Sequence, residues 1–505
     1  MSSKSTTVVT DTPANLTWSN SFSRLGEAFY SRVAPTPYQS GPEWVHFNPA
    51  AAAMLGLDDL PSTTLLSWLS GRSLPEGAAP LAMLYAGHQF GHYVPQLGDG
   101  RAIMLGEVLN PAGQRWEIQL KGSGVTPYSR DGDGRAVLRS TIREYLCSEA
   151  MHGLGIPTTR ALAMIRSEDE VYREQIEPGA MLTRLAPSHV RFGSFEVFFY
   201  RSELEAIRTL ADYVISHHYP ELLASDAAKA NPYLALLSEV TVRTARLIAQ
   251  WQAVGFAHGV MNSDNMSILG ITLDYGPFGF MEAYQPGYIC NHSDYSGRYA
   301  FDQQPQIGLF NLSCLAQALL PLLHDSPDEA VVQAKAVLDE YQGLFIREYA
   351  ALMRAKLGLL TSQDEDQALL SDLLDLMQAN QVDYTILFRR LGGFVPGDKN
   401  TALRDLFLDR EGFDHWAARY AARLAQEHSN DTERCARMHG VNPKYILRNY
   451  MAELAIRKAQ DERDYSLVDD LFRLLQQPFA EQPEFERFAG HPPEWAGQIS
   501  VSCSS

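Results

Sequence analysis

His258-Gly-Val-Met-Asn-Ser-Asp-Asn-Met-Ser-Ile-Leu-Gly-Ile-Thr-Leu-Asp-Tyr-Gly276 is the stretch that decides the fold class of this chain. It places an amide, Asn265, upstream of a carboxylate, Asp274, with apolar residues between them. Short strands formed by those apolar residues would hold the two polar side chains together. An amide oxygen and a carboxylate, completed by water and phosphate oxygens, form the octahedral set that Mg²⁺ prefers. The stretch therefore predicts a metal site.

The same stretch follows the order of a protein-kinase catalytic loop. In kinases a His-Arg-Asp begins the loop, an Asn five residues after that Asp binds metal, and Asp-Phe-Gly follows on the next strand. His258 and Asn265 keep this separation, and Asp274-Tyr275-Gly276 stands in for Asp-Phe-Gly. Taken alone, the stretch has an equally simple interpretation as a buried His-Gly turn followed by an Asx turn.

Upstream residues favour the kinase-like interpretation. Lys121 ends an alternating strand, and Glu144 follows on the next helical pattern. In kinases such a Lys holds the nucleotide phosphates and is oriented by a Glu from the following helix. A strand Lys and a helix Glu taken singly are more often solvated surface charges. Their order ahead of the metal-binding stretch supports a nucleotide site.

The element order predicts an α+β fold of the protein-kinase-like, two-lobed type, with a β-rich N-terminal lobe, a helical C-terminal lobe and an extension at each end. Strands are expected at 102–108, 116–121, 161–165 and 179–185, and helices at 48–56, 131–155, 204–218, 234–254, 309–323, 328–357, 367–379 and 445–461. The domains expected are an N-terminal extension (1–80, its first ~15 residues disordered), a nucleotide-binding region (81–200), a helical region with the catalytic loop (201–476) and an extended tail (477–505).

One position departs from the kinase pattern. Val260 stands where the catalytic Asp would accept the proton of the substrate hydroxyl. An isopropyl group cannot take a proton. Asp264 is the nearest carboxylate able to do so, and its different place in the loop would serve a differently placed hydroxyl. This disfavours phosphoryl transfer from the γ position.

Three clusters combine glycine and arginine. They are Gly98-Asp-Gly-Arg101, Gly122-Ser-Gly124 with Asp131-Gly-Asp-Gly-Arg135, and the pair Arg184 and Arg191. Glycine lets backbone N–H groups approach phosphate closely, and guanidinium groups give planar, bidentate donors for phosphate oxygens. The alternative is that they form hairpin turns and surface ion pairs.

Composition limits the partners and the compartment. The formal charge of −18 and the pI near 5.2 argue against nucleic acid as a partner. Met1 to Asn15 lacks the pattern of a secretory signal. We expect no apolar run to reach the ~20 residues of a membrane helix. Five widely spaced cysteines form neither a zinc pattern nor a disulfide framework. The sequence therefore predicts a cytoplasmic protein without a membrane partner.

Three longer stretches carry a family resemblance. They are Tyr85-Ala-Gly-His-Gln-Phe-Gly-His-Tyr-Val-Pro-Gln-Leu-Gly-Asp-Gly-Arg101, Leu120-Lys-Gly-Ser-Gly-Val-Thr-Pro-Tyr-Ser-Arg-Asp-Gly-Asp-Gly-Arg135 and Met261-Asn-Ser-Asp-Asn-Met-Ser-Ile-Leu-Gly270. With them the chain resembles the selenoprotein O family of protein adenylyltransferases from about Phe22 to the C-terminus. The resemblance implies a pseudokinase fold that binds ATP in a flipped orientation and transfers AMP to Ser, Thr or Tyr of protein substrates.

The resemblance also implies roles for single residues. Asp264 would be the proton acceptor, Asn265 and Asp274 would bind Mg²⁺, or Mn²⁺ in its place, and Glu144 would support Lys121. The residues expected to contact ATP are Gly98, Gly100, Arg101, Lys121, Asp133, Gly134, Arg184, Arg191 and Asp274.

The family often carries a selenocysteine or cysteine close to the C-terminus, and Cys503 takes that place here. Cys290 lies past Asp274, where a kinase activation loop would run. A Cys290–Cys503 disulfide that ties the tail to this loop is one hypothesis; two reduced thiols are the alternative.

Two other functions share much of this site. A phosphotransferase would use the same Lys121, Glu144, Asn265 and Asp274, although Val260 counts against it. A non-catalytic nucleotide-binding scaffold would have no need of a proton acceptor such as Asp264.

Overall fold

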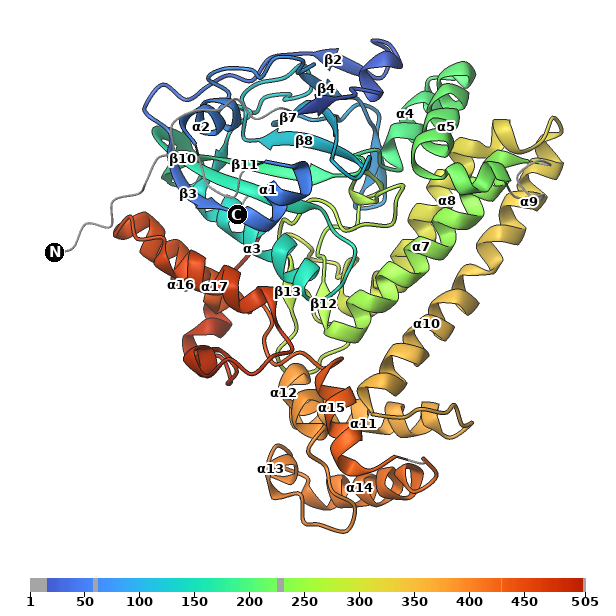
Figure 1. Ribbon diagram of the computed structural model, residues 1–505. Coiled ribbons are helices and arrows are strands. Elements are labelled where there is room, and N and C mark those ends of the chain that lie inside the picture. Colours follow the sequence, from blue (N-terminus) through green and yellow to red (C-terminus); the bar gives the residue numbers. More distant parts are fainter. Residues whose placement is uncertain (1–15, 58–61, 225–230, 428, 503–505) are drawn as a thin grey trace.

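A computed structural model of the chain describes residues 16–57, 62–224, 231–427 and 429–502 (Figure 1). Its strands are β1 (Thr17–Trp18), β2 (Tyr30–Arg32), β3 (Glu43–Phe47), β4 (Leu81–Met83), β5 (Gly87–Gln89), β6 (His92–Val94), β7 (Ala102–Leu109), β8 (Arg115–Lys121), β9 (Ala136–Val137), β10 (Arg160–Tyr172), β11 (Ile176–Ala186), β12 (Phe256–Ala257) and β13 (Gly279–Phe280). Its α-helices are α1 (Pro49–Leu55), α2 (Thr63–Leu69), α3 (Leu138–Gly153), α4 (Gly193–Tyr200), α5 (Leu204–His218), α7 (Pro232–Val254), α8 (Gln304–Leu323), α9 (Pro327–Asp339), α10 (Tyr341–Lys356), α11 (Asp366–Asn380), α12 (Tyr384–Leu391), α13 (Thr401–Arg404), α14 (Arg410–Leu424), α15 (Asp431–His439), α16 (Asn449–Asp461) and α17 (Ser466–Gln476).

The fold is mixed α+β, as the sequence predicts. In the described part of the chain the larger sheet has nine strands in the order β2-β4-β7-β8-β11-β10-β3, with β1 paired to β7 and β9 paired to β11. All of these pairs are antiparallel. The hairpin of β7 and β8 brings Lys121 opposite Ala102, and β11 pairs with β8 so that Leu182 lies opposite Lys121. Lys121 therefore lies on a strand with neighbours on both sides.

Helix α3 crosses one face of this sheet and separates it from the helical remainder of the chain (Figure 1). Its apolar side joins a core that also contains residues of the sheet, of α7 and of the C-terminal helices α16 and α17. A second apolar cluster contains residues of α11, α12 and α14, which lie at the lower end of the molecule in Figure 1. Burial of a helix face against neighbouring elements provides most of its stability.

Three strands among the described residues ahead of position 81, β1, β2 and β3, belong to the larger sheet. Strand β3 pairs with the edge of β10, and β2 pairs with β4, while Asn48 caps α1 by accepting a bond from the Ala51 amide at 3.1 Å. Gly56 ends α1 in the left-handed conformation at φ 74°. The predicted helix at 48–56 is confirmed as α1. The predicted N-terminal extension also provides strands of the larger sheet.

Several boundaries differ from the prediction. The helix expected from Asp131 begins only at Leu138, because residues 131–135 form a loop at the site described below. The helix expected over 328–357 is two helices, α9 and α10, that meet at Glu340. The tail is not simply extended, since it contains two short 3-10 helices, Pro483–Phe488 and Glu494–Gln498.

One segment differs from the prediction that no apolar run reaches the length of a membrane helix. Phe301–Leu323, which contains α8, is long and apolar enough to cross a membrane by length and composition, and no other helix among the described residues is. Within its apolar window 61% of the segment is buried inside the protein, as in the core helix of a globular domain.

Candidate active site

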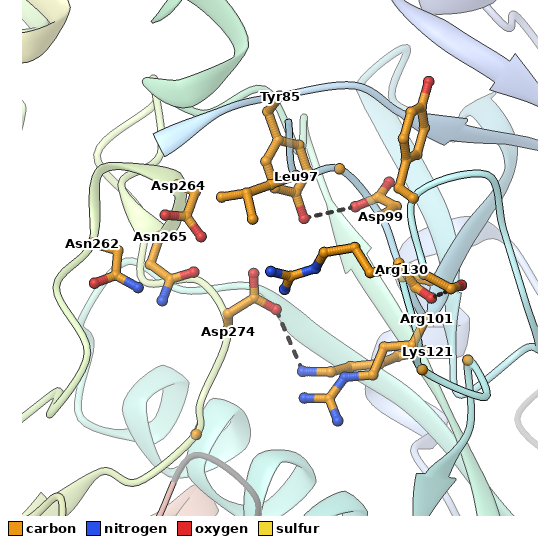
Figure 2. A pocket seen from close by; sticks show the side chains of 18 of the residues that line it. Tyr85, Leu97, Asp99, Arg101, Lys121, Arg130, Asn262, Asp264, Asn265 and Asp274 are labelled. Atoms are coloured by element: carbon orange, nitrogen blue, oxygen red, sulfur yellow. Dashed lines mark hydrogen bonds and ion pairs between the residues drawn. The ribbon is translucent and has the colours of Figure 1, made fainter. Parts of the chain in front are cut away.

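A cleft of about 560 Å³ lies between the larger sheet and the segment that follows α7. Its walls come from four regions of the chain: 85–102, 121–135, the β10–β11 turn with strand β11, and 260–277. Figure 2 shows acidic and amide side chains facing basic ones across this cleft. Six basic side chains line it, although the chain as a whole is strongly acidic: Arg101, Lys121, Arg130, Arg135, Arg173 and Arg184. The local field therefore favours an anionic ligand.

Lys121 and Glu144 meet as the sequence predicts. The Lys121 Nζ lies 2.5 Å from Glu144 Oε2 and 3.4 Å from Asp274 Oδ1. Burial lowers the pKa of Lys121, while the two carboxylates act in the opposite direction. The ammonium group is thus held on the cleft wall by Glu144 from α3, behind the cleft.

Asp274 is the meeting point of the cationic side chains. Its carboxylate accepts hydrogen bonds from Arg184 Nη1 and, at 2.7 Å, from Arg191 Nη1. Burial alone would raise the pKa of Asp274, but attraction to Arg184, Arg191 and Lys121 outweighs it and holds that pKa well below its usual value. The residue adopts φ 54°, a left-handed backbone that is uncommon outside glycine and clusters at functional sites.

The segment from Val260 to Asn265, here called the acceptor loop, carries the other acidic group. It ends in a short 3-10 turn over Ser263–Asn265. Asp264 is 6% exposed and lines the cleft, and its Oδ1 has no hydrogen-bond partner among the described residues. Burial raises the pKa of Asp264 to about 7, partly offset by a hydrogen bond from Gln89. A carboxyl group in this range can accept a proton near neutral pH.

Asn265 faces the cleft beside Asp264 (Figure 2). Its Nδ2 donates to the Val260 carbonyl at 2.9 Å, which leaves the amide oxygen for a cation. Asp274 lies on the same side of the cleft and provides a carboxylate. These oxygen donors fit a hard divalent cation such as Mg²⁺, with the remaining positions filled by water and phosphate oxygens.

His258 has a structural position. It is 1% exposed, and its Nε2 donates to the Leu273 carbonyl at 2.9 Å, next to Asp274. This bond ties the chain just before the acceptor loop to Leu273, the residue preceding Asp274. The short strands expected between Asn265 and Asp274 do not form; an isolated bridge between Met266 and Thr272 takes their place, because a turn at Gly270 closes the segment.

The glycine-rich segments form the wall opposite the acceptor loop. Gly98, Gly100, Arg101, Asp133 and Gly134 all line the cleft. A Cβ at Gly134, where φ is +68°, would lie 2.1 Å from the Gly124 carbonyl, so only glycine fits. Asp133 receives two hydrogen bonds from Arg173, at 2.8 and 2.9 Å, and these bonds lower the pKa of Asp133.

Two of the predicted residues lie behind the cleft wall, and a further pair falls partly outside the structure. Glu144 and Arg191 do not line the cleft and act on it through Lys121 and Asp274. Arg191 also stacks over the Tyr85 ring at 4.5 Å. Cys290 is buried, but Cys503 lies outside the described residues, and so does the hypothesis of their pairing.

Other cleft residues were not singled out from the sequence. The most informative are Tyr85, Gln89, Arg130, Arg173 and Asn262. Figure 2 shows the Arg130 side chain extending into the cleft toward Asp274. Tyr85 and Gln89 belong to the first of the three family stretches, which was the one signal available for them. Arg173 lies in the turn between β10 and β11, and no motif marks it.

Comparison with known proteins identifies the family that this chain resembles. The family described as "Protein adenylyltransferase SelO" matches residues 13–476. A relative from Thiobacillus denitrificans (strain ATCC 25259 / T1), described as protein nucleotidyltransferase YdiU, is 58% identical over 495 residues, which cover 97% of this chain and 99% of the relative. Proteins with the same description from Thioalkalivibrio sulfidiphilus (strain HL-EbGR7) and Myxococcus xanthus (strain DK1622) are 57% and 55% identical over 493 and 494 residues, each covering 97% of this chain and 99% of the relative.

Proposed function

Since the chain belongs to the SelO family of protein adenylyltransferases, we propose that it transfers AMP from ATP to Ser, Thr or Tyr hydroxyl groups of protein substrates with the help of a divalent cation. The observation that carries the proposal is the pairing, in one cleft, of a basic wall with a largely buried carboxylate, Asp264, that lines the cleft.

The proposed reaction is a single displacement at the α-phosphorus. The acceptor hydroxyl oxygen attacks the α-phosphate, its proton passes to Asp264, and the bond to the leaving pyrophosphate breaks. Positioning and electrostatic stabilisation dominate catalysis of phosphoryl-type transfers, and a row of buried cations is suited to that task. Lys121, Arg184 and the loop arginines would neutralise the phosphate charge.

Asn265 and Asp274 would hold the metal, Mg²⁺ or Mn²⁺. When bound there, the cation would supply positive charge that stabilises the charge developing on the leaving group. Removal of divalent cations with a chelator is therefore expected to abolish transfer.

A flipped ATP follows from the position of the proton acceptor. AMP transfer requires the α-phosphate, and not the γ-phosphate, to lie beside Asp264. The presence of Val260 at the usual kinase position, where it lines the cleft as an apolar wall, supports this orientation.

We also propose that the architecture is protein-kinase-like and two-lobed. Residues 81–200 would form the nucleotide-binding lobe and 201–476 the helical lobe. The cleft between the sheet and the acceptor loop supports this division.

The test uses purified protein, candidate protein substrates and Mg²⁺, with ATP labelled at the α- or the γ-phosphate. Protein-bound label from the α position alone is expected, and an Asp264→Asn variant should lose it. Label from the γ position would indicate a phosphotransferase. Label from neither, with ATP binding intact, would indicate a nucleotide-binding scaffold.

A further inference from the structure

Strand β5 runs along the acceptor loop and is hydrogen-bonded to it. The His88 amide donates to Ser263 Oγ at 2.7 Å. The Phe90 amide donates to the Tyr299 hydroxyl at 2.9 Å, and that hydroxyl donates to Asn262 Oδ1 at 2.5 Å. The strand is thus fixed to the loop through its backbone.

The opposite side of β5 is anchored to α4. The His88 Nδ1 lies 2.5 Å from Glu196 Oε2, and Glu196 is 1% exposed. Cys314 Sγ lies in the same group, within 4.8 Å of both. The His88 ring and the Glu196 carboxylate are bonded to each other, and this pair anchors β5 to α4. Side chains alternate along a strand, so Gln89 faces the other way from His88.

Gln89 faces the cleft and meets Asp264. Its Nε2 donates to Asp264 Oδ2 at 3.1 Å. A carboxylate only accepts hydrogen bonds, so the amide nitrogen of Gln89 must be the atom that faces it. The other oxygen, Oδ1, is buried and has no hydrogen-bond partner among the described residues.

The backbone at Gly87 lies close to the Asp264 side chain. A Cβ at Gly87, two residues before Gln89, would lie 2.4 Å from Asp264 Oδ1 and 2.8 Å from its Cβ. Any larger residue at this position would displace the carboxylate. Gly87 and Gln89 together confine Asp264 to one orientation.

We propose that Gln89 is a positioning residue for the transfer reaction: its amide holds Oδ2 of Asp264 while the Gly87 backbone covers Oδ1, which fixes the orientation in which the carboxylate meets the acceptor hydroxyl. This inference rests on the proposed role of Asp264 as proton acceptor. In enzymes a catalytic group works at full rate only when its neighbours hold it in the productive orientation.

The test replaces Gln89 by Met, which keeps the length of the side chain and removes both donors. The hydrogen bond of an amide to a charged group contributes about 1.5–3 kcal/mol, so kcat should fall about tenfold to hundredfold. KM for ATP and the Kd of a non-hydrolysable ATP analogue should change less than about threefold, because Gln89 acts through Asp264 and not on the nucleotide. Gln89→Glu should lower kcat further, since it sets a second carboxylate against Asp264.

Gln96→Met is the matched control. Gln96 accepts a hydrogen bond from Arg201 at 3.2 Å and does not line the cleft, so kcat should stay at the wild-type value.

Wild-type kcat in Gln89→Met would overturn the inference, as would a rise in KM with kcat unchanged. Thermal unfolding of each variant identifies any that fold poorly; if Gln89→Met does, Gln89→Glu provides the same comparison. Failure of wild-type protein to transfer the α-label would instead reject the proposed function, which is a separate result.

Discussion

The carboxylate of Asp274 lies within bonding distance of three cationic side chains, Lys121, Arg184 and Arg191. Arg184 and Arg191 are 3% and 1% exposed, so water could not solvate either guanidinium group if the carboxylate were removed. Removing one partner from a buried ion pair is costly, because it leaves charge buried and unpaired. Asp274 thus has a structural role beside its proposed role as metal ligand.

Asp274→Asn is expected to lower the free energy of unfolding by about 3–5 kcal/mol and to abolish AMP transfer. ATP without metal should raise the melting temperature more in the variant than in the wild type, because its phosphates replace the missing negative charge. Differential scanning fluorimetry with and without ATP measures both.

Asp133→Asn is the comparison. Its ion pair with Arg173 is partly exposed, and such pairs contribute about 0–1 kcal/mol. If Asp274→Asn were as stable as Asp133→Asn, the charge cluster would have no structural role.

At the scale of the elements, α10 ends in a buried lysine. Lys356 is 4% exposed, and its Nζ lies 4.5 Å from the Phe388 ring and 5.4 Å from the Tyr384 ring, both on α12. Burial lowers the pKa of Lys356 from 10.5 to about 7. The unfolded chain therefore binds the proton more tightly than the folded one.

Protonation of Lys356 makes the free energy of unfolding depend on pH. As pH falls from about 10 to about 7, protonation favours the unfolded state increasingly, and below 7 the penalty is constant. Lys356→Met should remove this penalty and stabilise the protein at pH 7 and below by up to about 5 kcal/mol, less the cation–π attraction to the two rings.

Chemical denaturation at pH 6, 7, 9 and 10 measures the effect. The gain from Lys356→Met should shrink as pH rises, whereas Lys335→Met, at an exposed position on α9, should give a constant difference. A gain independent of pH would contradict the argument.

Over the whole molecule, the C-terminal helices support the active cleft from behind. Helices α16 and α17 lie against α3, the helix that carries Glu144 (Figure 1). Arg143 on α3 donates to Asn449 Oδ1 at 3.2 Å, and a Cβ at Gly153 would lie 2.0 Å from the Leu475 carbonyl. Residues more than 300 positions apart in sequence thus share one core.

Leu474→Ala should therefore weaken the protein and the cleft together. Leu474 is fully buried against this core, and removing such a side chain costs about 2–5 kcal/mol. Transfer should decline at temperatures where α3 loosens. Leu408→Ala, at a side chain 90% exposed, should change stability by less than about 0.5 kcal/mol. Equal effects of the two substitutions would place α17 outside the cooperative core.

The sequence by itself determined the local parts of this protein. Strand β8 and most of helix α3 follow from hydrophobic periodicity, because such patterns act between residues close in the chain. The short strands expected between Asn265 and Asp274 do not form. The pairing of Lys121 with Glu144 followed from the order of these elements, and it is confirmed. The α+β class followed in the same way.

Tertiary structure decided the rest. It put Arg191 behind Asp274, brought Arg173 to Asp133, and set Gln89 against Asp264, 175 positions away. No local pattern encodes these contacts, because they depend on how distant segments pack. The sequence identified residue types that suit the proposed chemistry, and packing of a common core fixed which of them face the cleft and which hold the others in place.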